Sequence, residues 1–311
     1  MKKQTLIRAG IRLPNQMKLL ILFVLLMSTQ KGLVQGNKVS SRILPPIRKE
    51  YAEIEKLSAA PRPPFASLDS ISFPIEKMNK GFYRALKLRA VYIDVPVSHF
   101  KLPDFPANSS AQTRGELDYL LNLQKERTPE IITAAQQIAG VSFNPFVHPS
   151  DSNYKYYRRN LFHIGHSVGD WFNEVNLPRT ADLIANVWQD QLHYMWQFKF
   201  KYNRARPNAL EPKIKNLEQT MWPAYPSGHA SFAYTNAFLL QELLPEFKDV
   251  IYNDAYECAR SREVLGVHFP SDSESARILA RQLIDEMLKS EKFKKDLQSA
   301  KEELDKIKPK K

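Results

Sequence analysis

Apolar residues recur every three to four positions from about residue 109 to the end of the chain, whereas alternation with a period of two is almost absent. This pattern predicts an all-α fold. Ser110 and Thr128 stand where helix N-caps are expected, and Pro129 and Glu130 follow Thr128 in the order typical of a first helical turn. Further helices are predicted over residues 160–174, 178–201, 229–244, 247–265, 272–289 and 291–306.

The region before this pattern is irregular. Five prolines lie between residues 45 and 64, and proline disfavours regular structure. We therefore predict a proline-containing extension over 37–95, a single helical-bundle domain over 96–306 and a basic tail over 307–311. The run 90–95 (AVYIDV) is either a short strand or a wall segment of the main domain.

Composition is that of a soluble globular protein, with 311 residues, 43% hydrophobic and 25% charged. The net charge of +12 gathers at the two ends of the chain. Residues 1–36 carry six basic residues and no acid, and the stretch from Lys289 carries nine lysines against five acids. The charge is therefore weak evidence for nucleic acid, and no nucleic-acid partner is predicted.

Residues 19–27 form an apolar run of nine residues behind the basic lead. This run is too short to span a bilayer, so residues 1–36 are predicted to be a secretory signal peptide. The protein is then expected to be periplasmic or secreted, with no stable membrane span after signal removal. An uncleaved membrane anchor is the alternative. The single cysteine, Cys258, cannot form an intramolecular disulfide and is expected to be buried on a helix.

Lys199 and Arg206 are candidate anion ligands. They are seven residues apart, which on a helix is about two turns, so both side chains are predicted to leave one face. Pro207 is expected to end that helix. Two cations held at a helix end suit an anion, and the planar fork of arginine matches phosphate oxygens.

The segment Pro226-Ser227-Gly228-His229 lies where a loop is predicted to become a helix. Glycine lets backbone approach a ligand closely, and the first N–H groups of a helix are unpaired. Such a terminus binds anions. Ser227 is expected to cap the helix or donate its hydroxyl, and His229 to lie at the lip of the site.

The segment from Ser261 to Asp272 contains Arg262, a third cation, and His268 on a predicted short loop after Gly266. Residues 271–274 resemble a capping box that would open the next helix. Asp272, four residues after His268, can accept the proton of one ring nitrogen. The other nitrogen is then left as a nucleophile.

Together, these segments resemble the K-x6-RP, PSGH and SR-x5-H-x3-D pattern of the type 2 phosphatidic acid phosphatase (PAP2) superfamily, which includes the vanadium haloperoxidases. The resemblance is closer to the soluble bacterial class A non-specific acid phosphatases. It implies a bundle of the PAP2/vanadium haloperoxidase type and an acid phosphatase. Ala230 departs from the threonine usual in that class, and the cysteine pair of the class is missing.

The resemblance also implies roles for individual residues. His268 would be the nucleophile that forms a phosphohistidine, Asp272 its orienting partner and His229 the general acid. The expected substrates are small phosphate monoesters hydrolysed without a metal or other cofactor, with vanadate as an inhibitor. A homo-oligomer is left open. The residues expected to bind the substrate phosphate are Lys199, Arg206, Ser227, Gly228 and Arg262.

Other functions remain as alternatives. The same phosphate site would hold vanadate in a haloperoxidase, and a lipid or isoprenoid-pyrophosphate phosphatase would work at a membrane surface. A non-enzymatic anion-binding module is disfavoured by the intact motifs. His163, His166 and His193 offer a zinc site, but no suitably spaced acid or cysteine supports it, so packing roles are predicted for them.

Overall fold

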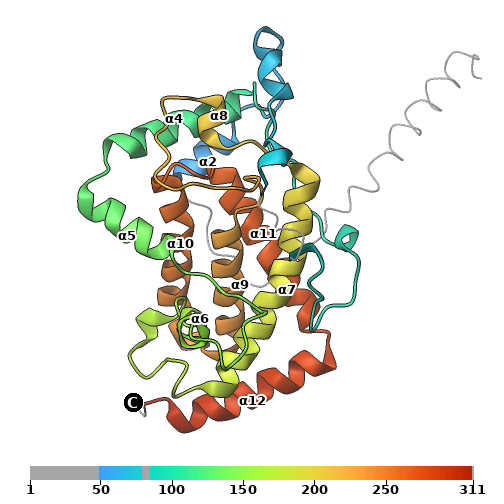
Figure 1. Ribbon diagram of the computed structural model, residues 1–311, viewed down its shortest axis with the longest axis vertical. Coiled ribbons are helices and arrows are strands. Elements are labelled where there is room, and N and C mark those ends of the chain that lie inside the picture. Colours follow the sequence, from blue (N-terminus) through green and yellow to red (C-terminus); the bar gives the residue numbers. More distant parts are fainter. Residues whose placement is uncertain (1–48, 79–84, 310–311) are drawn as a thin grey trace, which may run out of the picture. The chain divides into compact units, whose positions relative to one another are not determined.

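The computed structural model describes residues 49–78 and 85–309 (Figure 1). The predicted signal peptide lies outside these residues. Within the described part the chain forms helices and no strand, and its single β-bridge pairs Ser72 with Arg204. The all-α prediction is confirmed.

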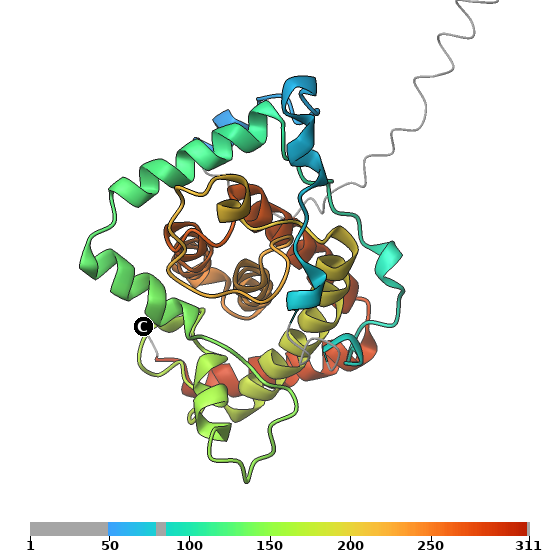
Figure 2. The same ribbon diagram turned by 45° about the horizontal axis from the view of Figure 1, so that its top comes forward.

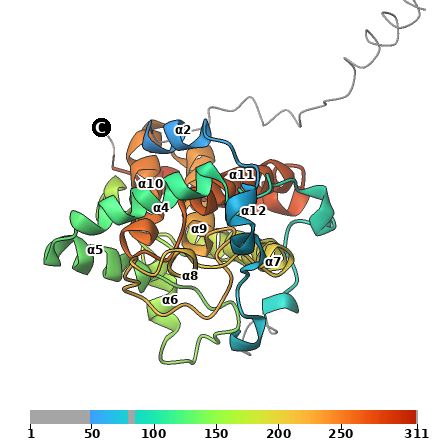
Figure 3. The ribbon, with the colours of Figure 1, turned by 90° about the horizontal axis from the view of Figure 1, so that it is seen from above.

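Helix α9 (Gly228–Leu243) is the centre of the bundle. It packs against α7 (Pro178–Tyr202), α10 (Lys248–Val264) and α11 (Pro270–Met287), as Figures 1 and 3 show. Its sequence is apolar or small on nearly all sides, which is typical of a fully buried helix. Ala230, Ala233 and Ala237 are completely buried, and their small side chains leave room for the neighbouring helices.

An outer layer flanks α10. Helices α4 (Ala111–Lys125) and α5 (Pro129–Ala139) both contact α10, and α2 (Lys49–Glu55) packs on α4. Both predicted caps are present, because the Ser110 hydroxyl accepts from the Thr113 N–H and the Thr128 hydroxyl from the Ile131 N–H. Each cap satisfies a backbone donor that has no partner within its helix.

Helix α12 (Glu291–Ile307) lies across α7. It buries Phe293, Leu297 and Leu304, which share one face at helical spacing. The Glu303 carboxylate accepts from the N–H groups of Arg179 and Thr180 in the first turn of α7, at 2.9 and 2.8 Å. This contact places a negative charge at the positive end of α7, where it stabilises the start of the helix.

Residues 90–95 form a wall segment rather than a strand. The Asp190 carboxylate of α7 accepts from the backbone N–H groups of Val91, Tyr92 and Ile93. A carboxylate with three such donors anchors the segment to the bundle. The predicted domain boundary at residue 95 remains a prediction.

The predicted helix over 160–174 is wrong. Helix α6 (Tyr154–Asn160) ends where that helix was expected to begin, and turns with one short 3₁₀ segment follow. Gly165 and Gly169 adopt positive φ angles of 99° and 132°, which no right-handed helix allows. The Gly165 N–H is also drawn to Asp254 of α10, at 2.9 Å.

Four helix ends meet at one end of the bundle. Helices α7 and α10 end there, and α9 and α11 begin there, with the Ser227 N–H donating to the Asp272 carbonyl at 2.9 Å. Helix α8 (Pro207–Leu210) and the loop after it cross over these ends (Figure 2). All three sequence motifs therefore lie in one region.

Candidate active site

Lys199 lies in the last turn of α7 and is buried, 2% exposed. Its Nζ donates to the carbonyl oxygens of Pro223 and Ala224 at 2.8 and 3.1 Å. An ammonium group has three donors, so with these two acceptors among the described residues one proton remains for a ligand. Burial, and next the nearby Arg206, lower the pKa of Lys199 well below its usual value. An anion bound beside it would oppose both effects.

Arg206 reaches the same place from outside the helix, so the prediction that it shares a helix face with Lys199 is wrong. Helix α7 ends at Tyr202, and Asn203 adopts a left-handed conformation with φ 46°. Asn203 is held there by Phe73, since its side-chain amide donates to the Phe73 carbonyl and its own carbonyl accepts from the Phe73 N–H. The chain then continues extended through Arg206 into α8.

His268 is held between a cation and a carboxylate. Nη1 of Arg206 lies 3.0 Å from His268 Nε2, and Nδ1 lies 3.0 Å from Asp272 Oδ2. A guanidinium only donates, so Nε2 carries the lone pair and Nδ1 carries the proton. Burial, and next Arg206, lower the pKa of His268 well below its usual value, while Asp272 opposes them. The neutral imidazole thus presents a lone pair on Nε2, as expected of a nucleophile.

Asp272 lies inside the first turn of α11 rather than beyond a capping serine. The helix begins at Pro270, and Asp272 accepts from the Phe269 N–H at 3.0 Å, so the predicted capping box at 271–274 is displaced. Burial alone would raise the pKa of Asp272, but Arg204 and His268 hold it well below its usual range. The carboxylate therefore stays ionised beside the imidazole.

Two further residues of this group were not predicted. Arg204, fully buried, donates to Asp272 Oδ1 at 2.7 Å and to Glu116 Oε2 at 3.1 Å. Glu116 of α4 also accepts from the Ser271 N–H at 2.7 Å. Both oxygens of Glu116 accept from N–H donors, as a carboxylate does. Glu116, Arg204, Asp272 and His268 thus form a continuous buried chain.

The sequence held only a weak signal for that chain. Arg204 lies two residues before Arg206, between the two predicted anion ligands Lys199 and Arg206. The spacing of these residues does not show that Arg204 is buried or which carboxylates it pairs with. Glu116 lies 88 positions from Arg204 in the sequence. It is a charged residue of an amphipathic helix, where such residues are usually exposed to solvent. Only the docking of α4 against the bundle end brings the two together.

The start of α9 supplies backbone donors. Ser227 is the N-cap, and its hydroxyl accepts from the Ala230 N–H at 3.4 Å, as predicted for a cap. The first N–H groups of a helix have no intrahelical acceptor. A Cβ on Gly228 would lie 3.9 Å from Cε of Lys199 and 3.7 Å from Cε of Met195. The absent side chain therefore leaves space beside the ammonium stem.

Arg262 and His229 form the other side of the site. One Arg262 nitrogen, Nη2, pairs with Glu218 Oε2 at 2.5 Å. Within the described residues, the buried Nε and Nη1 of Arg262 have no hydrogen-bond acceptor. His229 Nε2 lies 3.2 Å from the Ala139 carbonyl, which only accepts, so Nε2 carries a proton. Burial, and next Arg262, lower the pKa of His229 well below its usual value.

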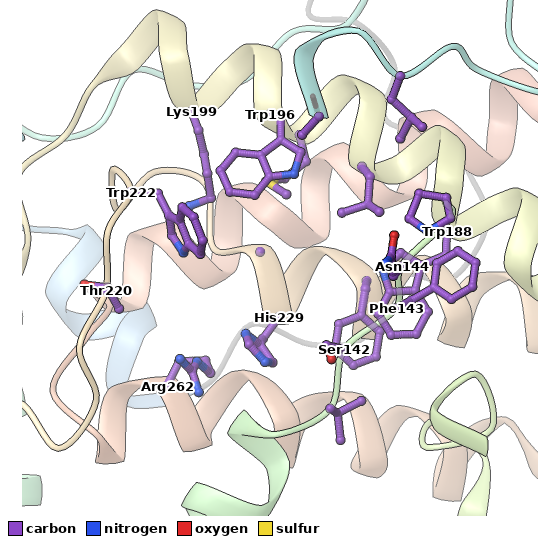
Figure 4. A pocket seen from close by; sticks show the side chains of 18 of the residues that line it. Ser142, Phe143, Asn144, Trp188, Trp196, Lys199, Thr220, Trp222, His229 and Arg262 are labelled. Carbon is purple, nitrogen blue, oxygen red and sulfur yellow. The ribbon is translucent and has the colours of Figure 1, made fainter. Parts of the chain in front are cut away.

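A cavity of about 510 Å³ joins these groups. Figure 4 shows Lys199, His229 and Arg262 directed into it from three different helices. Arg206, Gly228 and His268 line it too. Three cations, a helix start and two imidazoles therefore face one space. Unpaired donors in a buried cationic pocket favour a tetrahedral anion with several oxygen acceptors.

His163, His166, His193 and Cys258 are not among the residues that line this cavity. His193 Nε2 contacts Gln197, and its Nδ1 contacts the Leu88 carbonyl. The rings of His163 and His166 stack with their centroids 5.7 Å apart. Among the described residues, no group of three His, Cys, Asp or Glu side chains could hold a metal ion. Cys258 is buried on α10 as predicted, and burial raises the pKa of its thiol to about 12.

Comparison with known proteins agrees with the resemblance read from the motifs. Residues 183–285 match the family model of the PAP2 superfamily. A non-specific acid phosphatase of Providencia stuartii is 39% identical over 141 residues, covering 43% of this chain and 57% of that protein. One of Salmonella typhimurium is 27% identical over 144 residues, covering 44% and 57%. The chain thus spans little more than half the length of these curated relatives.

Among solved structures, a bacterial vanadium-dependent iodoperoxidase matches with a TM-score of 0.52 and 20% identity, over 77% of this chain and 63% of that one. At this identity the likeness concerns the fold, and it confirms a bundle of the PAP2/vanadium haloperoxidase type. In the described part of the chain no helix is long and apolar enough to cross a membrane.

Proposed function

We propose, from the match of residues 183–285 to the PAP2 superfamily model, that the protein is an acid phosphatase that hydrolyses phosphomonoesters through a phosphohistidine on His268. The observation that carries this proposal is the set of donors around the cavity, above all the buried Nε and Nη1 of Arg262 that lack an acceptor within the described residues. A phosphoryl group supplies the oxygens that such donors need.

In the first step, the Nε2 lone pair of His268 attacks phosphorus and the bond from phosphorus to the ester oxygen breaks. His229 gives its transferable proton to the leaving alkoxide. Because Nε2–H of His229 is engaged by the Ala139 carbonyl, that proton comes from Nδ1 of the protonated ring. Asp272 stabilises the positive charge that develops on His268 through the Nδ1–H bond.

In the second step, water attacks the phosphohistidine, His229 accepts the proton of that water and the nitrogen–phosphorus bond breaks. Lys199, Arg206, Arg262 and the Gly228 N–H are proposed to hold the equatorial oxygens through both steps. Phosphoryl transfer depends on positioning and charge stabilisation, which these groups supply from the protein itself. The reaction is therefore proposed to need no metal. Export to the periplasm or outside the cell, supported by the 1–36 pattern, is part of the same proposal.

The test is to trap the intermediate. The protein is mixed with a ³²P-labelled phosphomonoester, quenched in alkali within milliseconds, and mapped by mass spectrometry, with and without EDTA. Label on His268 with unchanged rates in EDTA is expected. Rapid hydrolysis with no labelled histidine would refute the mechanism. Vanadate with bromide and peroxide forms a second arm: inhibition of phosphate release without halogenation is expected, whereas halogenation would favour the haloperoxidase alternative.

A further inference from the structure

The cavity is much larger than the phosphate site at one side of it. Its volume of about 510 Å³ falls in the range that buries whole organic ligands. All of its charged lining residues belong to the site described above, namely Lys199, Arg206, Glu218 and Arg262, besides the two imidazoles. The rest of the described lining is neutral. We call five of its aromatic side chains the aromatic annex, namely Phe143, Trp188, Trp196, Trp222 and Phe232; Phe146 and Tyr157 line the cavity as well.

The annex extends along helix α7 away from the phosphate site. Trp188, Leu192, Trp196 and Lys199 line the cavity at positions that share one helix face. With 1.5 Å of rise per residue, the eleven steps from Trp188 to Lys199 span roughly 16 Å. The cavity therefore continues well beyond an anion held at the Lys199 ammonium.

The aromatic rings stand on both sides of His229 (Figure 4). Trp196 and Trp222 lie beside Lys199, while Phe143 and Trp188 lie beyond the imidazole. The centroids of the Trp196 and Trp222 rings are 5.3 Å apart at 80°, and those of Phe143 and Trp188 are 5.4 Å apart at 38°. The Trp188 ring also stacks on Phe232, with centroids 4.2 Å apart at 8°, so the annex rings pack on one another along the cavity wall. The group that protonates the leaving oxygen lies among them.

We propose that the aromatic annex binds the organic half of the substrate, and that the preferred substrates are phosphomonoesters of alcohols that carry a flat aromatic ring. This inference rests on the proposed phosphatase function. Edge-to-face and offset ring contacts add attraction beyond the burial of apolar area. A saturated group of the same size gains only from burial, and it has slightly more surface to bury. Ser142 and Asn144 line the same cavity and offer hydrogen bonds to ring heteroatoms.

The test compares 2-phenylethyl phosphate with 2-cyclohexylethyl phosphate. The two substrates have nearly the same leaving alkoxide, so their ratio of kcat/KM reports binding of the ring rather than the chemistry of cleavage. A ratio of roughly three to ten in favour of the phenyl substrate is expected from aromatic contact energies. A ratio at or below one would overturn the proposal, because a merely apolar pocket favours the cyclohexyl group.

Variants locate the effect. Trp222→Leu and Phe143→Leu each remove one ring and should lower the phenyl-to-cyclohexyl ratio towards one. The ratio is measured on one preparation, so any loss of folded protein cancels. Phe200→Leu is the matched control, since Phe200 is an exposed aromatic of α7 that is not among the lining residues, and its ratio should stay at the wild-type value. An unchanged ratio in both annex variants would also overturn the proposal.

Binding separates this inference from the proposed reaction. The non-hydrolysable 3-phenylpropylphosphonate and 3-cyclohexylpropylphosphonate are titrated into the wild-type protein by calorimetry. Tighter binding of the phenyl compound by roughly three- to tenfold supports the annex even if no ester is hydrolysed. Equal binding, with esters hydrolysed normally, would leave the phosphatase standing and remove the annex proposal.

Discussion

The two imidazoles that face the cavity are held in opposite ways. His268 lies between Arg206 and Asp272, and Asp272 is tied through Arg204 to Glu116 on another helix. The His229 ring contacts the Ala139 backbone carbonyl, and Arg262, the cation that most lowers its pKa, is shared with the partly exposed Glu218. One side of the site is a buried chain of charges. On the other side, the described residues give the His229 ring one hydrogen bond, to a neutral backbone carbonyl.

This difference corresponds to the two proposed tasks. A nucleophile needs one fixed tautomer and a fixed direction for its lone pair, which a carboxylate on Nδ1 and a donor near Nε2 provide. A general acid must gain and lose a proton in each cycle, so strong pairing in either state would slow it. Burial and next Arg262 lower the pKa of His229, so a phosphate dianion, which opposes the effect of Arg262, would raise that pKa and prepare His229 to act as the acid.

The largest effect is expected from His268→Ala, which removes the proposed nucleophile. Turnover should fall by a factor on the order of 10⁴ to 10⁶, as for other covalent nucleophiles. Phosphate and vanadate should still bind, measured by calorimetry, because the three cations remain. Activity within tenfold of wild type would show that the rigid side of the site does not carry the nucleophile.

His229→Ala should divide substrates by leaving group. Hydrolysis of alkyl phosphates should fall roughly 10²- to 10⁴-fold, whereas p-nitrophenyl phosphate, whose leaving group needs no proton, should lose far less. Steady-state kcat values on both substrates provide the measurement. His148→Ala is the control, since His148 is exposed and is not among the cavity-lining residues. Equal losses on both substrates would remove the general-acid role.

Glu116→Gln tests whether the buried chain matters beyond folding. The amide keeps an acceptor for one donor but places an NH₂ group against the other, and a roughly tenfold loss in kcat is expected from one unsatisfied buried contact. Loss of a negative charge also lowers the pKa of His268 further. The nucleophile then stays unprotonated to lower pH, so the acid limb of kcat/KM should move down.

The matched control for that variant is Asp118→Asn, an exposed carboxylate on the same helix that pairs with Arg114. It should leave kcat and the pH profile unchanged. A Glu116→Gln protein that loses melting temperature but keeps its pH profile would reduce Glu116 to a structural role.

The smallest effect is expected from Glu218→Gln, on the loosely tied side. Glu218 competes with phosphate for Arg262, so its removal should tighten inhibition by phosphate roughly two- to fivefold, in line with a partly exposed ion pair. Without the negative charge of Glu218 beside it, Arg262 should lower the pKa of His229 further. The basic limb of kcat/KM should therefore move to lower pH. Glu257→Gln, an exposed carboxylate on α10, serves as control. Weaker phosphate inhibition would contradict the competition.

The sequence by itself determined most of the bundle's helices, two caps and the order of the motif residues, because each depends on neighbours a few positions away. Ser110 and Thr128 cap the helices that follow them, since the hydroxyl and the N–H it binds are three residues apart. The His268–Asp272 contact is of the same kind, four residues apart across one turn. Such contacts are set by local backbone geometry.

Tertiary structure alone decided how those residues are joined. Arg206 enters the site because the chain changes direction at Asn203, whose conformation Phe73 stabilises. Residues 160–174 form turns instead of a helix, and one of these turns is held by a hydrogen bond from Gly165 to Asp254 of α10. The pairing of Arg204 with Glu116 also depends on which helix faces cover the bundle end. Contacts between residues far apart in the chain follow from helix packing and from the burial of charge. Neither produces a repeating pattern of residues that could be recognised in a single sequence.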